Sequence, residues 1–291
     1  MLKIDGSLQT EFSKKNLRAG NGNLSNLIKA HNYMIKISII TICFNSERDI
    51  EITMKSVIEQ KYKKVEYIII DGLSTDSTIK KAERLKDKYL ELDIQIYSEK
   101  DKGIYDAMNK GIDKSTGQLI CHLHAGDYFI QDNTLSQVVE SYNKFNWQWG
   151  VGSSIVIDEK CNELFKYRPC KNKEMLKIKN CIPHQSTFID RKLFKELGVF
   201  KVDYDQAMDY DLWLRFAFLG NKNFYILDFD VTCFLDGGVS ADIKSLIKIL
   251  WKIRRNGERY KIYSNVIEDI VYVTRVFLFN IYRQLQGVLK K

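Results

Sequence analysis

The sequence is poor in the residues that usually separate domains. It contains two prolines in 291 residues, Pro169 and Pro183, and no tract rich in glycine and serine. Because such tracts mark flexible linkers, their scarcity leaves no clear position for a boundary between independent domains. Long apolar runs are also missing. The best candidate, residues 270–281, is interrupted by Thr274 and Arg275, so no segment is predicted to span a membrane.

The cysteines lack the spacing of a metal or redox motif. None of the six forms a C-x-x-C pair, and several lie inside apolar runs. We therefore expect free, buried thiols of the kind found in a reducing cytosol. The six are Cys43, Cys121, Cys161, Cys170, Cys181 and Cys233.

A secretory signal is not evident at the start of the chain. Residues 1–32 are polar, rich in Asn, Lys and Ser, and have no apolar centre. We expect residues 1–34 to form a loosely held extension before the first strand, and we expect a cytoplasmic protein.

Composition and charge are those of an ordinary globular protein with a modest basic excess. Hydrophobic residues make up 45%, charged residues 28%, and the formal net charge is +8. A basic balance suits nucleic acid, an anionic substrate or an anionic membrane face. Because the positive charge is not gathered near the motifs described below, we favour an anionic substrate or membrane and predict no nucleic-acid partner.

The first half of the chain alternates between strand and helix patterns. Apolar runs predict strands at 37–43, 65–70, 93–97 and 118–123. Helical patterns follow from about residue 47, at 75–89 and at 104–114, the first with Ser46 and Asp49 spaced as a capping box. This alternation predicts a parallel, doubly wound sheet.

The second half is less regular. Residues 149–157 and 162–167 are expected to pair as antiparallel strands across the turn at 158–160. Further strands are expected at 186–189 and 224–234, with a helix at 209–219 between them. From residue 240 onward the pattern is helical.

Acidic residues stand at positions where open α/β sheets bind ligands. Asp71 directly follows the buried strand at 65–70, at what would be the carboxyl end of that strand. Three further acidic clusters lie downstream, at Glu99/Asp101, Asp127 and Asp209/Asp211. A carboxylate accepts hydrogen bonds from a base or ribose but repels phosphate. The set therefore suggests a nucleotide diphosphate that is held partly through a metal.

Several segments match a known family in order and spacing. They are Ile39-Ile40-Thr41 with Phe44-Asn45, Ile70–Thr78, Ser98–Gly111, Leu123–Asp127, Pro183–Ser186 and Met208–Arg215. Each motif is weak alone, but together they resemble an inverting family-two glycosyltransferase of the GT-A fold. The resemblance implies an α/β, Rossmann-like, mostly parallel sheet flanked by helices, with a C-terminal helical extension. It implies a catalytic domain at 35–239, with a nucleotide-sugar half at 35–130 and an acceptor half at 131–239.

The same resemblance implies roles for the strand-end residues of the first half. Asp71 would accept a hydrogen bond from the nucleobase, in a pocket that Thr41, Phe44 and Asn45 line. The alternative is a strand-end residue that caps the next helix, which is the expected role of Asp76.

The loop before the helix at 104–114 is the second donor-binding element that the resemblance implies. Asp101 would face the ribose or base, Lys102 would reach a phosphate, and Gly103 would allow close backbone approach. Asn109, on the following helix, is equally compatible with a structural role.

The segment His124-Ala125-Gly126-Asp127 stands where the family usually carries an Asp-x-Asp motif for Mg²⁺ or Mn²⁺. This chain keeps the last carboxylate, Asp127, while His124 and Gly126 occupy positions where other members have acids. One carboxylate suffices when phosphate oxygens and waters complete the octahedron. His124 is either a second ligand or a wall contact. The resemblance also places His184 and Gln185 near the acceptor and the diphosphate, with a structural histidine as the alternative.

The helix that begins near Asp209 carries the general base in the family. The motif position favours Asp209, with Asp211 as the reserve and helix capping as the alternative for either. The base would take the proton of the acceptor hydroxyl as its oxygen attacks the anomeric carbon.

The C-terminal helices, residues 240–291, carry a basic stripe. Lys244, Lys248, Lys252 and Arg255 recur at helical spacing beside apolar residues. Such a helix either lies on the inner membrane surface, packs against the catalytic domain or contacts another subunit of a homo-oligomer.

The function expected from these features is sugar transfer from a nucleotide-diphosphate donor, such as a UDP-sugar, to a hydroxyl of a lipid-linked or polysaccharide acceptor. Surface glycans such as O-antigen or capsule are the acceptors expected by analogy with the family. A sugar-phosphate nucleotidyltransferase would need a Gly-rich basic loop after its first strand, where Phe44-Asn45-Ser46-Glu47 stands. A non-catalytic relative that binds sugar nucleotide, or scaffolds an assembly, is the other alternative, because the metal motif is incomplete.

Overall fold

The computed structural model describes residues 34–202, 204, 206–236, 248–250, 252–253, 270–271, 274 and 277–278. Residues Ile35–Lys291 form one compact unit, to which the description below refers. The predicted extension lies almost wholly outside the described residues, as do Lys244 and Arg255 of the predicted basic stripe. Within the described part of the chain, no helix has both the length and the apolar character to cross a bilayer.

The first half forms a parallel sheet. Its strands are β1 (Ile37–Cys43), β2 (Val65–Asp71), β3 (Asp93–Ser98) and β4 (Leu119–His122), and the helices between them are α3 (Ile50–Ile58), α4 (Thr78–Lys88) and α5 (Ile104–Lys114). The strands lie in the order β3-β2-β1-β4, and each neighbouring pair is parallel. Runs such as Ile68-Ile69-Ile70 are completely buried, because helices cover both faces of such a sheet. The predicted alternation is confirmed.

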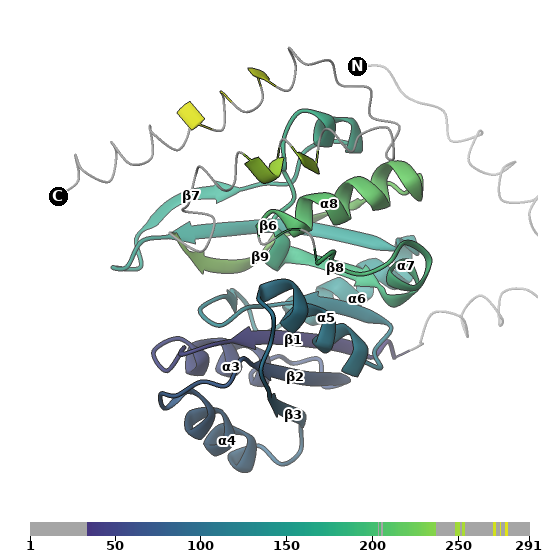
Figure 1. The fold of residues 1–291 in the computed structure, drawn as a ribbon. Coiled ribbons are helices and arrows are strands. Elements are labelled where there is room, and N and C mark those ends of the chain that lie inside the picture. The colour runs from purple at the N-terminus through teal and green to yellow at the C-terminus, as the bar shows by residue number, and fades with distance from the viewer. Residues whose placement is uncertain are drawn as a thin grey trace, which may run out of the picture. The chain divides into compact units, whose positions relative to one another are not determined.

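The second half extends the sheet with antiparallel pairs (Figure 1). The added strands are β5 (Tyr128–Phe129), β6 (Trp149–Ile157), β7 (Glu163–Tyr167), β8 (Thr187–Asp190) and β9 (Tyr225–Leu235). Beyond β4 the order is β8-β6-β9-β5, and β7 pairs with β6. β8 is antiparallel to both β4 and β6, whereas β9 is parallel to β6. The antiparallel pair predicted at 149–157 and 162–167 is confirmed.

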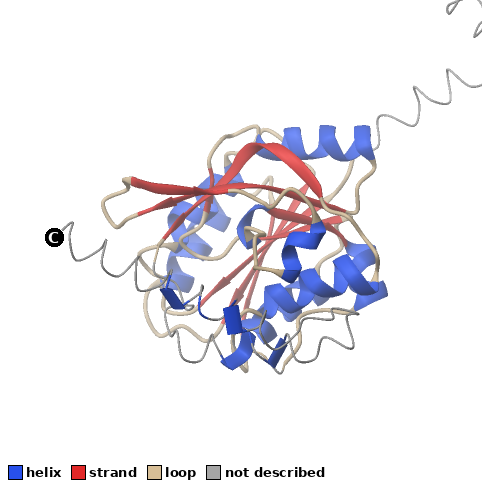
Figure 2. Ribbon diagram, turned by 90° about the horizontal axis from the view of Figure 1, so that it is seen from above, coloured by secondary structure: helices blue, strands red, loops and turns tan. Residues whose placement is uncertain are grey.

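Helices cover both faces of this sheet (Figure 2). Two of them, α6 (Thr134–Phe145) and α7 (Arg191–Leu197), were not predicted from the pattern. The helix predicted at 209–219 is α8 (Met208–Leu214), and it continues as a π-helical turn at Arg215–Leu219. Alternate residues of β1 point to opposite faces, so that Ile40 joins the core beneath α5 and α8, while Ile39 joins the core beneath α3 and α6.

The predicted start of the first helix is wrong. α3 begins at Ile50, and its N-cap residue, Asp49, makes no side-chain capping bond. The hydroxyl of Ser46 donates instead to the carbonyl of Phe44 (3.2 Å), while the Ser46 backbone N–H donates to Thr78 Oγ1 (2.7 Å). Residues before α3 therefore form a loop that is tied to the start of α4, and this use of Ser46 competes with capping.

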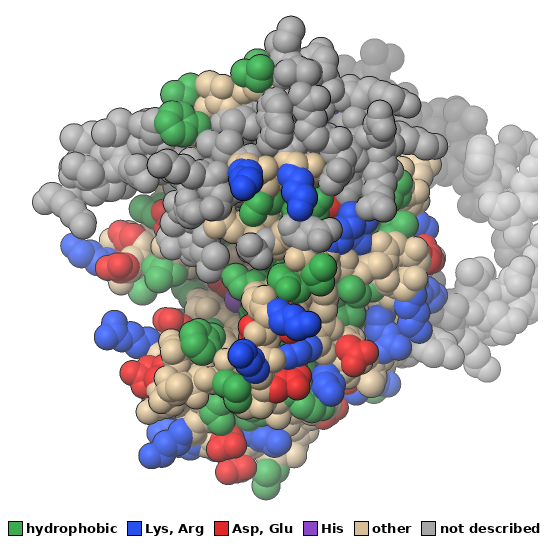
Figure 3. All heavy atoms as spheres, in the orientation of Figure 1, with side chains coloured by type: hydrophobic (Ala, Val, Ile, Leu, Met, Phe, Trp, Pro, Cys, Tyr) green, Lys and Arg blue, Asp and Glu red, His purple; other side chains and the backbone are tan. Residues whose placement is uncertain are grey.

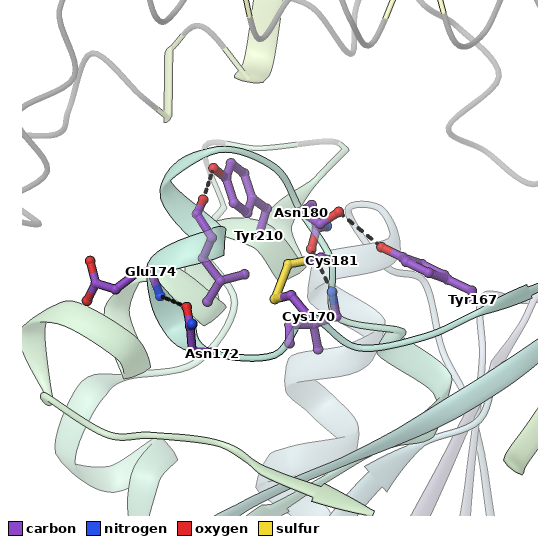
Figure 4. The surroundings of a disulfide bond; sticks show 9 residues. Tyr167, Cys170, Asn172, Glu174, Asn180, Cys181 and Tyr210 are labelled. Carbon is purple, nitrogen blue, oxygen red and sulfur yellow. Dashed lines mark hydrogen bonds between the residues drawn. A yellow bond between two sulfur atoms is a disulfide. The ribbon is translucent and has the colours of Figure 1, made fainter. Parts of the chain in front are cut away.

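The expectation of free, buried thiols is wrong for three of the six cysteines. Cys170 and Cys181 form a disulfide, with their Cα atoms 5.5 Å apart. Cys161 is free but exposed, whereas Cys43, Cys121 and Cys233 are free and buried as expected. The bridged pair is separated by 11 residues, a spacing that carries no motif, and becomes close only because the chain turns back between β7 and β8 (Figure 4).

Candidate functional site

The first group of predicted site residues lies at the carboxyl ends of β1, β2 and β3. Asp71 ends β2 and is completely buried. Its carboxylate accepts hydrogen bonds from the Ser74 backbone N–H (3.0 Å), the Ser74 hydroxyl (2.5 Å) and the Ser98 hydroxyl (2.6 Å). In this arrangement Asp71 shapes the loop after β2, and contact with a nucleobase requires Ser74 or Ser98 to give way.

The loop after β1 interlocks with the loop after β2. The backbone N–H of Asn45 donates to Ser74 Oγ (2.8 Å), and Asn45 Oδ1 accepts from the Thr75 backbone N–H (2.9 Å). Asn45 has a φ of +48°, in the left-handed region that Asn tolerates better than most residues. Beside it, Phe44 is 61% exposed, which leaves an aromatic face open at this end of the sheet.

The loop after β3 joins this group through Asp101. A Cβ added at Gly72 would lie 2.6 Å from Asp101 Oδ2 and 3.4 Å from Phe44, so these three residues are close neighbours. Asp101 Oδ1 accepts from the Gly103 backbone N–H (2.9 Å), and Gly103 has a φ of +122°, which favours glycine. Lys102 is exposed.

Two of the residues singled out in the sequence, Thr41 and Asn109, form hydrogen bonds to the backbone of neighbouring segments. Thr41 is completely buried, and its hydroxyl donates to the Leu123 carbonyl (2.6 Å), which fastens β1 to the segment after β4. Asn109 donates to the Phe200 carbonyl (2.8 Å) and accepts from the Phe200 N–H (3.0 Å). Thr41 therefore does not line the pocket in this structure, and Asn109 ties α5 to the segment after α7.

The second group surrounds Asp127, beyond the end of β4. Its backbone N–H donates to the His124 carbonyl (2.9 Å), across the turn at Gly126, whose φ is +99°. Burial raises the pKa of the Asp127 carboxyl to about 8, although hydrogen bonds from the His124 backbone and the Gln185 side chain act in the opposite direction. Gln185 belongs to a short 3₁₀ turn, His184–Ser186, which leads into β8.

Three histidines cluster beside Asp127. The ring centroids of His184 and His124 are 5.2 Å apart, and those of His184 and His122 are 5.6 Å apart. Burial lowers the pKa of His124 to about 3 and that of His184 to about 4, and it also lowers the pKa of His122. All three rings are therefore neutral near pH 7. Figure 3 shows a histidine inside a recess between the β6–β7 hairpin and the parallel half of the sheet.

Several polar atoms around this cluster are buried without a partner. They include Nε2 of His124 and both ring nitrogens of His184. The His184 and Trp213 rings are neighbours, with centroids 6.1 Å apart. Because an unpaired buried polar atom costs about 1–3 kcal/mol, such a concentration is typical of a site whose partner is a ligand.

Asp209 and Asp211 have opposite environments although they stand two residues apart on α8. Asp211 is completely buried and forms ion pairs with Arg215 Nε (2.8 Å) and Lys201 Nζ (3.0 Å). Asp209 is half-buried, and its Oδ2 accepts a hydrogen bond from Asn180 Nδ2 (3.2 Å). Burial raises the pKa of Asp209, while the bond from Asn180 opposes that rise. Asp211 is thus held in ion pairs within the protein, whereas Asp209 forms no ion pair with the other residues that the structure describes.

The contacts join Asp127 and Asp209 through one connected set of side chains. Gln185 reaches Asp127, its neighbour His184 contacts Trp213, and Trp213 lies one helical turn after Asp209 on α8. The first group, around Asp71, lies at the carboxyl ends of β1, β2 and β3, and β1 is the parallel neighbour of β4. A separate hollow of about 330 Å³, lined by residues 116–118 and 190–192, belongs to the amino end of β4 and contains none of the predicted site residues.

Sequence reasoning missed four residues that contribute to this arrangement. Asn180 carried no signal, because its role depends on the disulfide next to it. The serines at 74 and 98, which occupy the carboxylate of Asp71, also carried none. Arg215 did carry a signal, because it lies four residues after Asp211 and such pairs meet on a helix.

Metal binding has a limited protein basis. Among the described residues, no group of three or more His, Cys, Asp or Glu side chains could hold a metal ion. Asp127 with the unpaired Nε2 of His124 nearby fits a site of one carboxylate, which would need ligands from a bound diphosphate and water.

Comparison with known proteins identifies a family for this chain. The profile of the family described as Glycosyl transferase family 2 matches residues 38–198. An uncharacterised glycosyltransferase of Mycobacterium tuberculosis is 30% identical over 187 residues, which cover 62% of this chain and 68% of that protein.

Two solved structures show the same fold. TarS 1–349 of S. aureus, in complex with UDP-GlcNAc, matches with a TM-score of 0.63 at 14% identity, covering 84% of this chain and 72% of that one. A mannosyltransferase from Pyrobaculum calidifontis, in complex with GDP-Man and Mn²⁺, matches with a TM-score of 0.60 at 16% identity, covering 91% and 87%. The expected GT-A fold is confirmed.

Proposed function

The chain belongs to glycosyltransferase family 2, and from that premise we propose that it moves one sugar from a nucleotide-diphosphate donor to a hydroxyl of an acceptor, with inversion at the anomeric carbon. The observation that carries the proposal is the connected set from Asp127 through Gln185 and His184 to Asp209. This connection supports a role for Asp127 as diphosphate anchor and for Asp209 as base in one site beyond the ends of the strands, where α/β folds bind ligands.

For the donor we propose a UDP-sugar. The exposed ring of Phe44 offers a face for stacking on the base, and Asp101 lies beside it to accept from the ribose or base. Lys102, exposed in the same loop, is placed to reach a phosphate. Solved members of the fold hold UDP-GlcNAc and GDP-Man, which supports a nucleotide sugar without choosing the sugar.

For the cation we propose Mg²⁺ or Mn²⁺ on Asp127, next to the diphosphate. When bound, such an ion supplies Lewis-acid stabilisation of the negative charge on the leaving diphosphate. The protein's part is to hold one carboxylate in a buried turn, fixed by the His124 backbone and Gln185. The unpaired nitrogens of His124 and His184 are available to donate to, or accept from, diphosphate oxygens or sugar hydroxyls.

For the base we propose Asp209. Its carboxylate takes the proton of the acceptor hydroxyl while that oxygen forms a bond to the anomeric carbon and the bond to the diphosphate breaks. A single displacement of this kind inverts the configuration. Because burial raises the pKa of Asp209, its conjugate acid is less acidic than an exposed carboxyl, which makes the carboxylate a better proton acceptor.

For the acceptor we propose a lipid-linked or polysaccharide glycan of the cell surface, reached from the cytoplasmic face of the membrane. This part of the proposal depends on the basic C-terminal stripe at Lys248 and Lys252 and on analogy within the family. Flotation with vesicles that contain anionic lipid tests it: co-flotation that is lost at high salt supports the membrane role.

The proposed reaction is tested with a panel of sugar nucleotides and detection of the released nucleoside diphosphate, with and without Mn²⁺. The anomeric configuration of the first product, read by NMR before it equilibrates, distinguishes inversion from retention. Retention, or no release with any donor under conditions where UDP binds, would refute the proposal. UDP binding that is indifferent to Mn²⁺, combined with no release, would favour a non-catalytic sugar-nucleotide binder, for which the incomplete metal motif is the support.

A further inference from the structure

The segment from Cys170 to Cys181 is closed on itself. We call residues 170–181 the disulfide loop, because the bridge joins its two ends. The Cys170 backbone N–H also donates to the Cys181 carbonyl (3.2 Å), and both cysteines are buried. Inside the loop, Asn172 Oδ1 accepts from the Glu174 N–H (3.1 Å) and so begins the 3₁₀ turn at Lys173–Lys177 (Figure 4). The loop is therefore a fixed structural element.

The disulfide loop packs on α8, the helix that carries Asp209. The hydroxyl of Tyr210, a completely buried residue, donates to the Leu176 carbonyl (2.5 Å). Lys173 Nζ, in the same loop, donates to the Ala217 carbonyl (3.2 Å) just beyond α8. Two separate points of the loop are thus tied to the helix and its extension.

Asn180 is the point at which the disulfide loop meets the candidate base. Its Nδ2 donates to Asp209 Oδ2 (3.2 Å), and its carbonyl accepts from the Tyr167 hydroxyl (3.2 Å). Asn180 directly precedes Cys181, so the bridge fixes its backbone on one side while Tyr167 holds it on the other (Figure 4).

The start of α8 is held in an unfavourable backbone conformation. Ala207, its N-cap residue, has a φ of +53°, in the left-handed region that alanine rarely adopts. Such a conformation persists where surrounding contacts determine the path of the chain. The contacts that fix the path here include those of the disulfide loop with Tyr210 and Asp209.

We propose that Asn180 is a positioning residue for Asp209, and that the Cys170–Cys181 bridge keeps Asn180 in place. The inference depends on the proposed function, in which Asp209 is the base. Asn180 does not touch the reacting atoms. Its amide N–H donates to Oδ2 and the Tyr210 backbone N–H donates to Oδ1 (2.8 Å), so that both oxygens are oriented while their remaining lone pairs stay able to accept the proton of the acceptor. The hydrogen bond also favours the charged form of Asp209.

The first test separates positioning from general structure. In Asn180→Ala, kcat falls by about 10- to 100-fold, as expected for losing one hydrogen bond to a charged group, while the KM for the donor is unchanged. Asn180→Asp keeps the shape of the side chain but removes the donor N–H, and the kcat of this variant is expected to fall at least as far as that of Asn180→Ala. In an Asp209→Asn background, Asn180→Ala causes no further loss, because the two residues act through one interaction.

The second test concerns the bridge. Replacement of both cysteines by serine lowers kcat in the same direction as Asn180→Ala, whereas Cys161→Ser, which removes an exposed free thiol, leaves kcat unchanged. Should the doubly substituted protein not fold, Tyr210→Phe replaces it, because it detaches the Leu176 carbonyl while the bridge stays intact. A wild-type kcat in the folded double variant, or in Tyr210→Phe when that replaces it, would overturn the role of the loop.

The third test does not depend on turnover. The titration of Asp209 is followed by ¹³C NMR of protein labelled at aspartate, with Asp209→Asn to assign the signal. Asn180→Ala is expected to raise the midpoint of Asp209. If the wild-type protein transfers nothing, the proposed function fails, and the midpoint alone decides this inference. An unmoved Asp209 midpoint, or an active Asn180→Ala enzyme with wild-type kcat, would overturn it.

Discussion

Asp209→Asn and Asp211→Asn are the same chemical change two residues apart, and the structure predicts opposite outcomes. Asp211 is completely buried, and the guanidinium that it neutralises is 4% exposed. Arg215 also donates to the carbonyls of Leu197 (2.5 Å) and Val199 (2.7 Å), so it ties α8 to the segment after α7. Removing the charge of Asp211 leaves this buried cation without its counter-ion.

The expected loss of stability in Asp211→Asn follows from the burial of this ion pair. Removing one partner of a buried ion pair costs about 3–5 kcal/mol, and the asparagine oxygen still accepts one bond from Arg215, so about 2–4 kcal/mol is expected for Asp211→Asn. Asp209 forms no ion pair with the residues that the structure describes, and burial opposes its charge. Its replacement should change the free energy of unfolding by less than about 1 kcal/mol, while turnover falls by about 10²- to 10⁴-fold.

Urea unfolding followed by tryptophan fluorescence measures the free energy of unfolding, since Trp213 on α8 stacks against Trp149. Turnover at saturating donor measures the catalytic loss. In wild type, kcat/KM should fall as the pH drops through the raised pKa of Asp209, so the acid limb lies above the ordinary value of 3.8. Near-normal turnover in Asp209→Asn, or full stability in Asp211→Asn, would show that the two roles are assigned wrongly.

Four further outcomes are expected. Phe44→Ala should weaken UDP binding by about 2- to 10-fold without changing stability, because the ring is exposed; calorimetry decides, and unchanged affinity contradicts stacking. Asp127→Ala should abolish the Mn²⁺-dependent part of the UDP thermal shift; if that part survives, the metal assignment is wrong. His184→Phe should raise the free energy of unfolding by about 1 kcal/mol and reduce turnover, since two unpaired nitrogens disappear; a less stable variant contradicts this. Burial alone raises the pKa of Glu66, but bonds from Lys36, Ser38 and Thr116 lower it to about 2. Its stabilisation is therefore present above the unfolded value of 4.5 and is lost as the pH falls toward 2. Glu66→Gln should accordingly cost about 2–3 kcal/mol at pH 7 and little at pH 2, and an equal cost at both refutes it.

The parallel half of the sheet could be predicted because burial on both faces leaves unbroken apolar runs. Ile68-Ile69-Ile70 needs no partner elsewhere in the chain to be recognised as a covered strand. The second half has shorter or mixed elements, and α7 spans only Arg191–Leu197, too short for a helical period to be distinguished from chance. Local pattern therefore predicted the parallel half of the sheet better than the half with antiparallel pairs.

The choice between the two carboxylates of α8 could have been made from the sequence in part. Residues two apart on a helix lie about 200° apart around its axis, so Asp209 and Asp211 cannot face the same recess. Arg215 stands four residues after Asp211, which predicts their pairing and leaves Asp209 as the free acid. Which face of α8 is turned toward His184 depends on β6 and β8 beneath it, and no local pattern contains that information.

The disulfide shows a different limit of sequence reasoning. Cys170 and Cys181 become neighbours because Leu176 is buried against α8 and the loop folds back on itself, which is a tertiary event. The absence of a C-x-x-C motif carried no information about a structural bridge. Asn180 was missed for the same reason.

The distribution of hydrogen-bonded and unpaired polar groups explains the positions of the Asp211–Arg215 ion pair and the disulfide loop. A site that binds a polar ligand must keep donors and acceptors unpaired in the free protein, as His184 does, and each of them costs stability. Groups of that kind hold their places only if neighbouring residues are fixed by other bonds. The Asp211–Arg215 pair and the disulfide loop provide that fixation from outside the recess. Substitutions in the Asp211–Arg215 pair or the disulfide loop should therefore lower the free energy of unfolding. Substitutions within the recess should reduce turnover and leave the free energy of unfolding equal or higher.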